Sequence, residues 1–102
     1  MARLVVMYGQ PKDAGAFDKH YFERQIPLAK KIPGLRKYEI SRGAIATPGG
    51  AARYLLIAIL FFDDLKAIQS AFASPEGQAA AADAAAIATG GVEMFFFEHD
   101  EV

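Results

Sequence analysis

Two stretches of the chain decide its fold: Arg53 to Phe62 (RYLLIAILFF) and Val92 to Phe97 (VEMFFF). Both are short and rich in β-branched and aromatic residues, so they predict β-strands. Side chains alternate between the two faces of a strand, and a strand with one wet face therefore alternates between apolar and polar residues. These two stretches are instead apolar on both faces. In the first, one face holds Leu55, Ile57, Ile59 and Phe61, and the other holds Tyr54, Leu56, Ala58, Leu60 and Phe62.

A sheet built from such strands needs a cover on each face. The helices that a chain of 102 residues can form cover one face, and the other face must be covered by another molecule or a large ligand. Burial of about six large side chains at roughly 1.5 to 3 kcal/mol each is comparable with the cost of association, about 4 to 15 kcal/mol. We therefore expect a homodimer that forms through the sheet face.

Composition restricts the class of protein. A length of 102 residues with 53% hydrophobic residues fits one domain, residues 1–102,. The net charge of −1 offers no electrostatic surface for nucleic acid or an anionic membrane,. Because there is no cysteine, no export signal and no apolar stretch of membrane-spanning length, a cytoplasmic location is expected,.

The order of the remaining elements predicts the topology. Turn residues and caps divide the chain into a strand at 4–8, a helix from Asp13, a strand at 35–44, the strand at 53–62, a helix pair at 63–89 and the last strand,. Thr47 to Ala52 (TPGGAA) predicts a mobile connection,. This order is that of an α+β, ferredoxin-like split β-α-β domain with a four-stranded antiparallel sheet.

The first helix contains a proline that breaks its regular hydrogen bonding. Pro27 has no N–H and its ring crowds the preceding turn, so we expect a kink or a restart between Gln25 and Leu28,. A kink leaves polar backbone groups free beside Gln25.

The elements collected so far resemble the EthD family over nearly the whole chain. The most specific fragments are Pro27 to Ala29 (PLA), Pro33 to Leu35 (PGL) and Ala73 to Gln78 (ASPEGQ), in that order and spacing. The resemblance implies a dimeric α+β barrel in which two protomers pack their sheets face to face. It also implies a departure at Gln25, where the family pattern places a histidine. A glutamine can donate and accept hydrogen bonds but cannot move a proton as histidine does.

Four residues are candidates for binding a ligand: His20, Tyr21, Gln25 and Tyr38. Gln25 either contacts a ligand or satisfies the kink, and His20 is either a functional residue or one at the boundary of the core. The phenols of Tyr21 and Tyr38 can polarise a carbonyl if they face one cavity, although aromatic residues on strands often belong to the core. Asp83 is interpreted as structural. No spacing of histidines or carboxylates predicts a metal site, and no cofactor fingerprint is present.

Two functions that involve a small molecule remain open, beside a third possibility, a stress-related structural dimer that binds no ligand. The first is a small homodimer that binds a small, mostly apolar organic molecule between helix and sheet, as an accessory to the catabolism of organic compounds. The second, which the resemblance implies, is a cofactorless enzyme of the lactone isomerase, polyketide cyclase or monooxygenase type. That enzyme needs a proton acceptor, and with Gln25 in place the acceptor must be His20, His99 or a carboxylate,.

Overall fold

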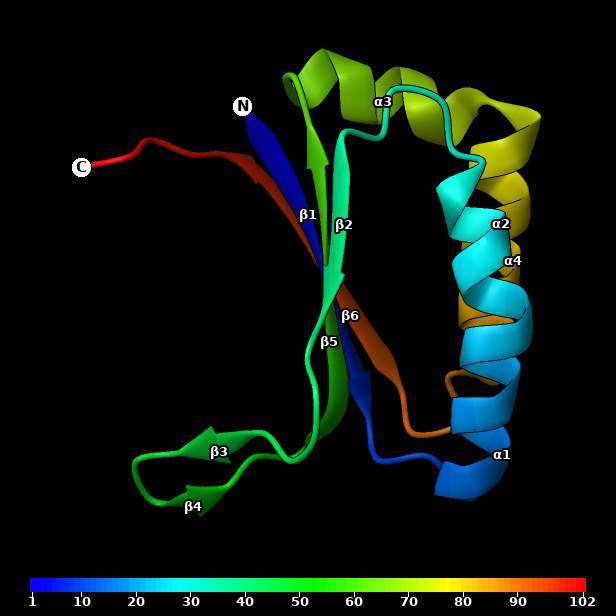
Figure 1. Ribbon diagram of the computed structural model, residues 1–102, viewed down its shortest axis with the longest axis vertical. Coiled ribbons are helices and arrows are strands. Elements are labelled where there is room, and N and C mark those ends of the chain that lie inside the picture. Colours follow the sequence, from blue (N-terminus) through cyan, green and yellow to red (C-terminus); the bar gives the residue numbers. More distant parts are fainter.

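The computed structural model describes residues 1–102, with all the helices on one face of a four-stranded sheet (Figure 1). The strands of this sheet are β1 (Ala2–Gly9), β2 (Lys37–Ile40), β5 (Tyr54–Phe62) and β6 (Val92–Glu98). Their order is β2-β5-β1-β6, and each neighbouring pair is antiparallel. The predicted α+β, ferredoxin-like arrangement is confirmed. The second strand is shorter than the predicted 35–44.

The helices begin at the cap residues that the sequence predicts. They are α1 (Ala14–His20), the π turn η1 (Tyr21–Gln25), α2 (Ile26–Lys30), α3 (Leu65–Ala73) and α4 (Pro75–Ile87). Carboxylates of Asp13 and Asp64 accept the first-turn N–H groups of α1 and α3, at 3.0 and 2.7 Å, and the Ser74 hydroxyl does the same for α4 at 3.0 Å. The adjacent Asp63 does not cap α3 and pairs with Arg36 at 2.9 Å.

The regular α-helix is interrupted and restarts where the sequence predicts: a π turn spans Tyr21–Gln25, and α-helical structure resumes at Ile26 with Pro27 in its first turn. The Ile26 N–H reaches back five residues to the carbonyl of Tyr21, which is the i→i+5 pattern of a π-helix. Such a turn inserts one extra residue, and it precedes the position at which Pro27 cannot donate. The elements α1, η1 and α2 follow one another without a break (Figure 1), and the π turn contains both Tyr21 and Gln25.

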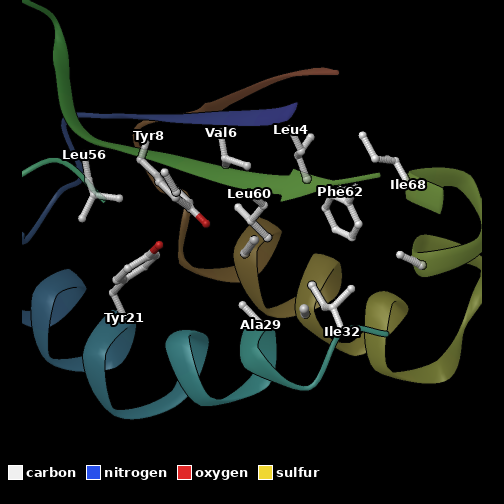
Figure 2. Close-up of a cluster of buried hydrophobic side chains, with 14 of the residues drawn as sticks. Leu4, Val6, Tyr8, Tyr21, Ala29, Ile32, Leu56, Leu60, Phe62 and Ile68 are labelled. Atoms are coloured by element: carbon white, nitrogen blue, oxygen red, sulfur yellow. The ribbon is translucent and has the colours of Figure 1, made fainter. Parts of the chain in front are cut away.

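The core lies between the sheet and the helices (Figure 2). Its sheet side consists of alternate residues of the two central strands: Ala2, Leu4, Val6 and Tyr8 of β1 and Leu56, Ala58, Leu60 and Phe62 of β5. Helix α4 packs closely against α3 because its residues are small. A Cβ added to Gly77 would lie 2.0 Å from the carbonyl oxygen of Ala71.

The other face of the sheet has no helix over it (Figure 1). We call it the open face; its apolar residues are Val5, Met7, Ile57, Ile59, Phe61, Phe95 and Phe97. Phe95 and Phe97 of the edge strand β6 are 50% and 43% exposed. Phe61 differs from the expectation and is only 8% exposed, because Arg3, Lys37 and His99 of the same chain lie against its ring.

The segment expected to be a mobile connection forms a small hairpin instead. Strands β3 (Ala46–Thr47) and β4 (Gly50–Ala51) pair with each other, and the Thr47 hydroxyl donates to the carbonyl of Gly50 at 3.0 Å. The hairpin and the C-terminal residues extend from the sheet on the side of the open face (Figure 1). None of the helices is long and apolar enough to cross a lipid bilayer.

Candidate functional site

A cavity of about 30 Å³ lies between the sheet and the helical layer. Fourteen of its fifteen lining residues are hydrophobic, and Gln25 is the exception. The wall formed by α4 consists of Ala80, Ala81 and Ala84, whose small side chains leave space beside the sheet. The only exposed lining residue is Met94 on the edge strand β6, at 42% exposure. The cavity is therefore an apolar chamber with one polar side chain from the helix layer.

Three phenols meet in this cavity. Tyr21 of the π turn and Tyr38 of β2 share a hydrogen bond, with their hydroxyl oxygens 2.5 Å apart. Tyr8 of β1 lines the same space, and its hydroxyl points toward that of Tyr21 (Figure 2). Phe17 stacks on the Tyr21 ring with centroids 5.8 Å apart, and Tyr8 meets that ring edge-on at 5.7 Å. The tyrosine rings are thus fixed by aromatic contacts from both layers.

Burial keeps these phenols neutral. It raises the pKa of Tyr8, Tyr21 and Tyr38 above the usual 10.0, and the nearby Tyr38 adds to the effect on the other two. The physical cause is that a phenolate loses its hydration when buried among apolar side chains. At neutral pH the three hydroxyls are therefore hydrogen-bond donors and acceptors, and none is a base.

Apart from the tyrosines, Gln25 is the only buried residue with a polar side chain. It is 6% exposed, it faces the cavity, and its Oε1 has no hydrogen-bond partner. An unpaired buried acceptor is costly, and native structures contain few of them. The π turn brings this amide to the same face as Tyr21, four residues earlier. The amide is therefore held by the fold in a position where the protein itself does not satisfy it.

His20 does not line this cavity. Its Nε2 lies 2.8 Å from Oδ1 of Asp83 on α4, and since a carboxylate can only accept, Nε2 carries the proton,. The side chains are 37% and 15% exposed, and the second oxygen of Asp83 is buried without a partner. Asp83 also contributes, after burial and Tyr38, to raising the pKa of Tyr8. Asp83, interpreted as structural from the sequence, joins α4 to α1 through the side chain of His20.

The structure thus brings Tyr21, Gln25 and Tyr38 together and places His20 outside. Tyr8 was missed as a site residue, although the alternation of Leu4, Val6 and Tyr8 puts all three on one face of β1. The sequence assigns the Met94 to Phe97 cluster to the core and the dimer face, with part of it open to lining an apolar pocket, and Met94 is the member of the cluster that lines the cavity. No three side chains of the kinds that bind metals converge on one point.

Comparison with known proteins identifies the family. The EthD domain matches residues 10–91. An uncharacterised 11.0 kDa protein from the thcB-thcC intergenic region of Rhodococcus erythropolis is 37% identical over 102 residues, which are 100% of this chain and 98% of that protein. The crystal structure of an EthD family protein from Bacillus halodurans superposes with a TM-score of 0.90 at 35% identity, covering 98% of this chain and 99% of the other. The chain belongs to the EthD family, as its sequence motifs indicate.

More distant structures share the fold alone. SnoaB, a cofactor-independent oxygenase from Streptomyces nogalater, matches with a TM-score of 0.69 at 18% identity, over 99% of this chain and 94% of that one. A dimeric ferredoxin-like protein of unknown function from Jannaschia sp. matches with a TM-score of 0.71 at 21% identity, over 96% and 98%. The ferredoxin-like fold therefore occurs both in an oxygenase and in proteins without an assigned role.

Proposed function

We propose that this protein is a homodimer that binds a small, mostly apolar organic molecule in the cavity between the π turn and the sheet, as an accessory to the catabolism of organic compounds. The observation that carries the proposal is the unpaired Oε1 of Gln25 inside an otherwise apolar lining. Small-molecule sites combine apolar walls with a few convergent polar groups. The three phenols and the amide provide such groups, and membership of the EthD family is consistent with this role.

Dimerisation through the open face supports the same proposal. Phe95 and Phe97 lie on that face with much of their surface exposed, beside the half-buried Val5, Ile57 and Ile59. A contiguous apolar surface of this kind is typical of a protein interface. A solved structure of the same fold is described as dimeric. Sedimentation of the wild type should give a dimer, and Phe95→Asp should give a monomer; a monomeric wild type would contradict this part of the proposal.

The binding role is tested by filling the cavity. A library of small neutral organic compounds is screened against the wild type by ligand-observed NMR, and hits are tested against Ala84→Leu and Ala85→Leu. Ala84 is buried in the lining, whereas its neighbour Ala85 is exposed. We expect hits to lose binding in Ala84→Leu and to keep it in Ala85→Leu. If no compound binds, or if the hits bind Ala84→Leu as tightly as the wild type, the cavity is not the binding site.

A second candidate function, a cofactorless enzyme, is favoured by the carboxylate of Asp83. One of its oxygens accepts from His20 and the other is buried without a partner. After burial and Tyr38, Asp83 also helps to raise the pKa of Tyr8. This carboxylate could accept a proton from a substrate beside the phenols. Turnover of candidate lactones or phenolic polyketides that is lost in Asp83→Asn and in Tyr38→Phe would favour this function. Turnover that is unchanged in both variants would exclude Asp83 and Tyr38 from the catalytic step.

A further inference from the structure

We propose that the cavity selects neutral ligands that carry a hydroxyl group, which donates a hydrogen bond to Gln25 and accepts one from the tyrosines. This inference rests on the proposed binding function and names the class of ligand. It follows from the hydrogen-bond acceptor, the hydrogen-bond donors, the charge and the volume of the cavity.

The acceptor of the site is Oε1 of Gln25. It is buried and has no partner within the protein, and the residue that carries it lines the cavity. A ligand that donates a hydrogen bond satisfies it, whereas a pure hydrocarbon, an ether or a ketone leaves it unpaired. The ligand therefore needs a donor at this point.

The donors of the site are phenol hydrogens. In the pair formed by Tyr21 and Tyr38, one hydroxyl donates to the other, and the accepting hydroxyl keeps its own hydrogen,. Tyr8 brings a further hydroxyl to the same cavity. Burial raises the pKa of all three, which keeps these hydrogens in place at neutral pH. The ligand therefore needs an acceptor as well as a donor, and a hydroxyl group supplies both from one atom.

The charge of the lining excludes ionic ligands. No Lys, Arg, Asp or Glu lines the cavity, and Gln25 is its only residue that is not hydrophobic. Transfer of a carboxylate or an ammonium into such surroundings without a partner charge is strongly unfavourable. A neutral alcohol or phenol fits these walls, whereas a carboxylic acid at neutral pH does not.

The dimensions show where the rest of the ligand lies. A volume of about 30 Å³ holds a hydroxyl group and little more, so the hydrocarbon part must displace a side chain. Met94 is the exposed member of the lining, and its unbranched thioether adopts other rotamers readily,. We place the hydrocarbon part of the ligand under Met94, at the edge of the sheet.

The test uses protein labelled with ¹³C at its methionine methyl groups. Met94 reports on the cavity, and Met7, on the open face, is the internal control. The full-length protein is titrated with phenol, anisole, toluene and benzoate, which differ in donor, acceptor and charge. The same titrations are made with Gln25→Leu, with Gln25→Met should the first variant not fold, and with Gln69→Leu, which changes an exposed glutamine of α3.

In the wild type we expect phenol to shift the Met94 methyl signal at lower concentration than anisole or toluene, and benzoate to leave it unchanged. Gln25→Leu should lower the affinity ratio of phenol to toluene about five- to tenfold, since one hydrogen bond is lost. Gln69→Leu should keep the wild-type ratio. Toluene binding with a ratio that Gln25→Leu does not change would overturn the ligand class and leave the binding function standing. If no compound moves the Met94 signal, both fall together.

Discussion

Replacement of Gln25 by leucine should make the protein more stable. The amide is 6% exposed and its Oε1 is unpaired, and an unsatisfied buried polar group costs about 1–3 kcal/mol. Leucine has a similar volume, no polar atom and a nearly equal helix propensity. We therefore expect the free energy of unfolding to rise by about 1–2 kcal/mol, which corresponds to roughly 4–8 °C in Tm for each kcal/mol in a domain of this size.

Urea denaturation at one fixed protomer concentration measures this change, because the stability of a dimer depends on concentration. The midpoint should move to higher urea while the slope stays constant. The matched control is Gln69→Leu on the surface of α3, which should stay within about 0.5 kcal/mol of the wild type. If Gln25→Leu is instead destabilised by more than about 1 kcal/mol, the amide is satisfied in the folded protein. In that case Gln25 has no unpaired acceptor to offer a ligand.

Three further outcomes follow from the structure. The free energy of unfolding should fall as the pH rises above 10.0, since the cavity phenols have raised pKa values when folded and lose protons first in the unfolded chain,; in Tyr54→Phe, which keeps only the three cavity phenols, tyrosinate absorbance that precedes the loss of circular dichroism would contradict this. His20→Ala should cost about 1 kcal/mol in chemical denaturation by leaving Asp83 without its donor, and a double-mutant cycle with Asp83→Asn should show coupling. Gly77→Ala should lower the melting temperature strongly, because the new Cβ would lie 2.0 Å from a carbonyl oxygen of α3. Gly49→Ala should change the melting temperature little, because the nearest atom to its Cβ lies at 3.9 Å. Equal melting temperatures for the two variants would contradict the close packing of α4 on α3.

The fold could be predicted from sequence because its signals are local. The caps Asp13 and Ser74 and the alternation of the strands depend on neighbouring residues only, and they gave the right elements in the right order. The alternation placed Phe61 on one face of its strand with Ile57 and Ile59, but it did not predict the burial of this side chain. The burial depends on Arg3 and His99, which are far from Phe61 in the sequence. Contacts of that kind have no local signature.

The site was only partly predictable for a similar reason. Pro27 indicates that the regular hydrogen bonding of the helix is interrupted, but the sequence alone does not distinguish a kink from a π turn,. Tyr21 and Gln25 are four residues apart, a spacing that shares one face of a helix, and both line the cavity. His20 immediately precedes Tyr21 and faces Asp83 on α4 instead. Asp83 lies 63 residues from His20 in the sequence, so no local pattern predicts this contact.

The edge strand β6 connects the two parts of the proposal. Met94 and Phe95 are neighbours in the sequence and therefore point to opposite faces of the sheet,. Both are exposed, at 42% and 50%, but on different sides of the sheet: Phe95 lies on the open face, and Met94 lies on the side of the cavity. A second protomer on the open face would bury Phe95 and would leave Met94 free to move. An apolar strand at this edge can therefore stabilise a dimer through one set of side chains and admit a ligand past the other.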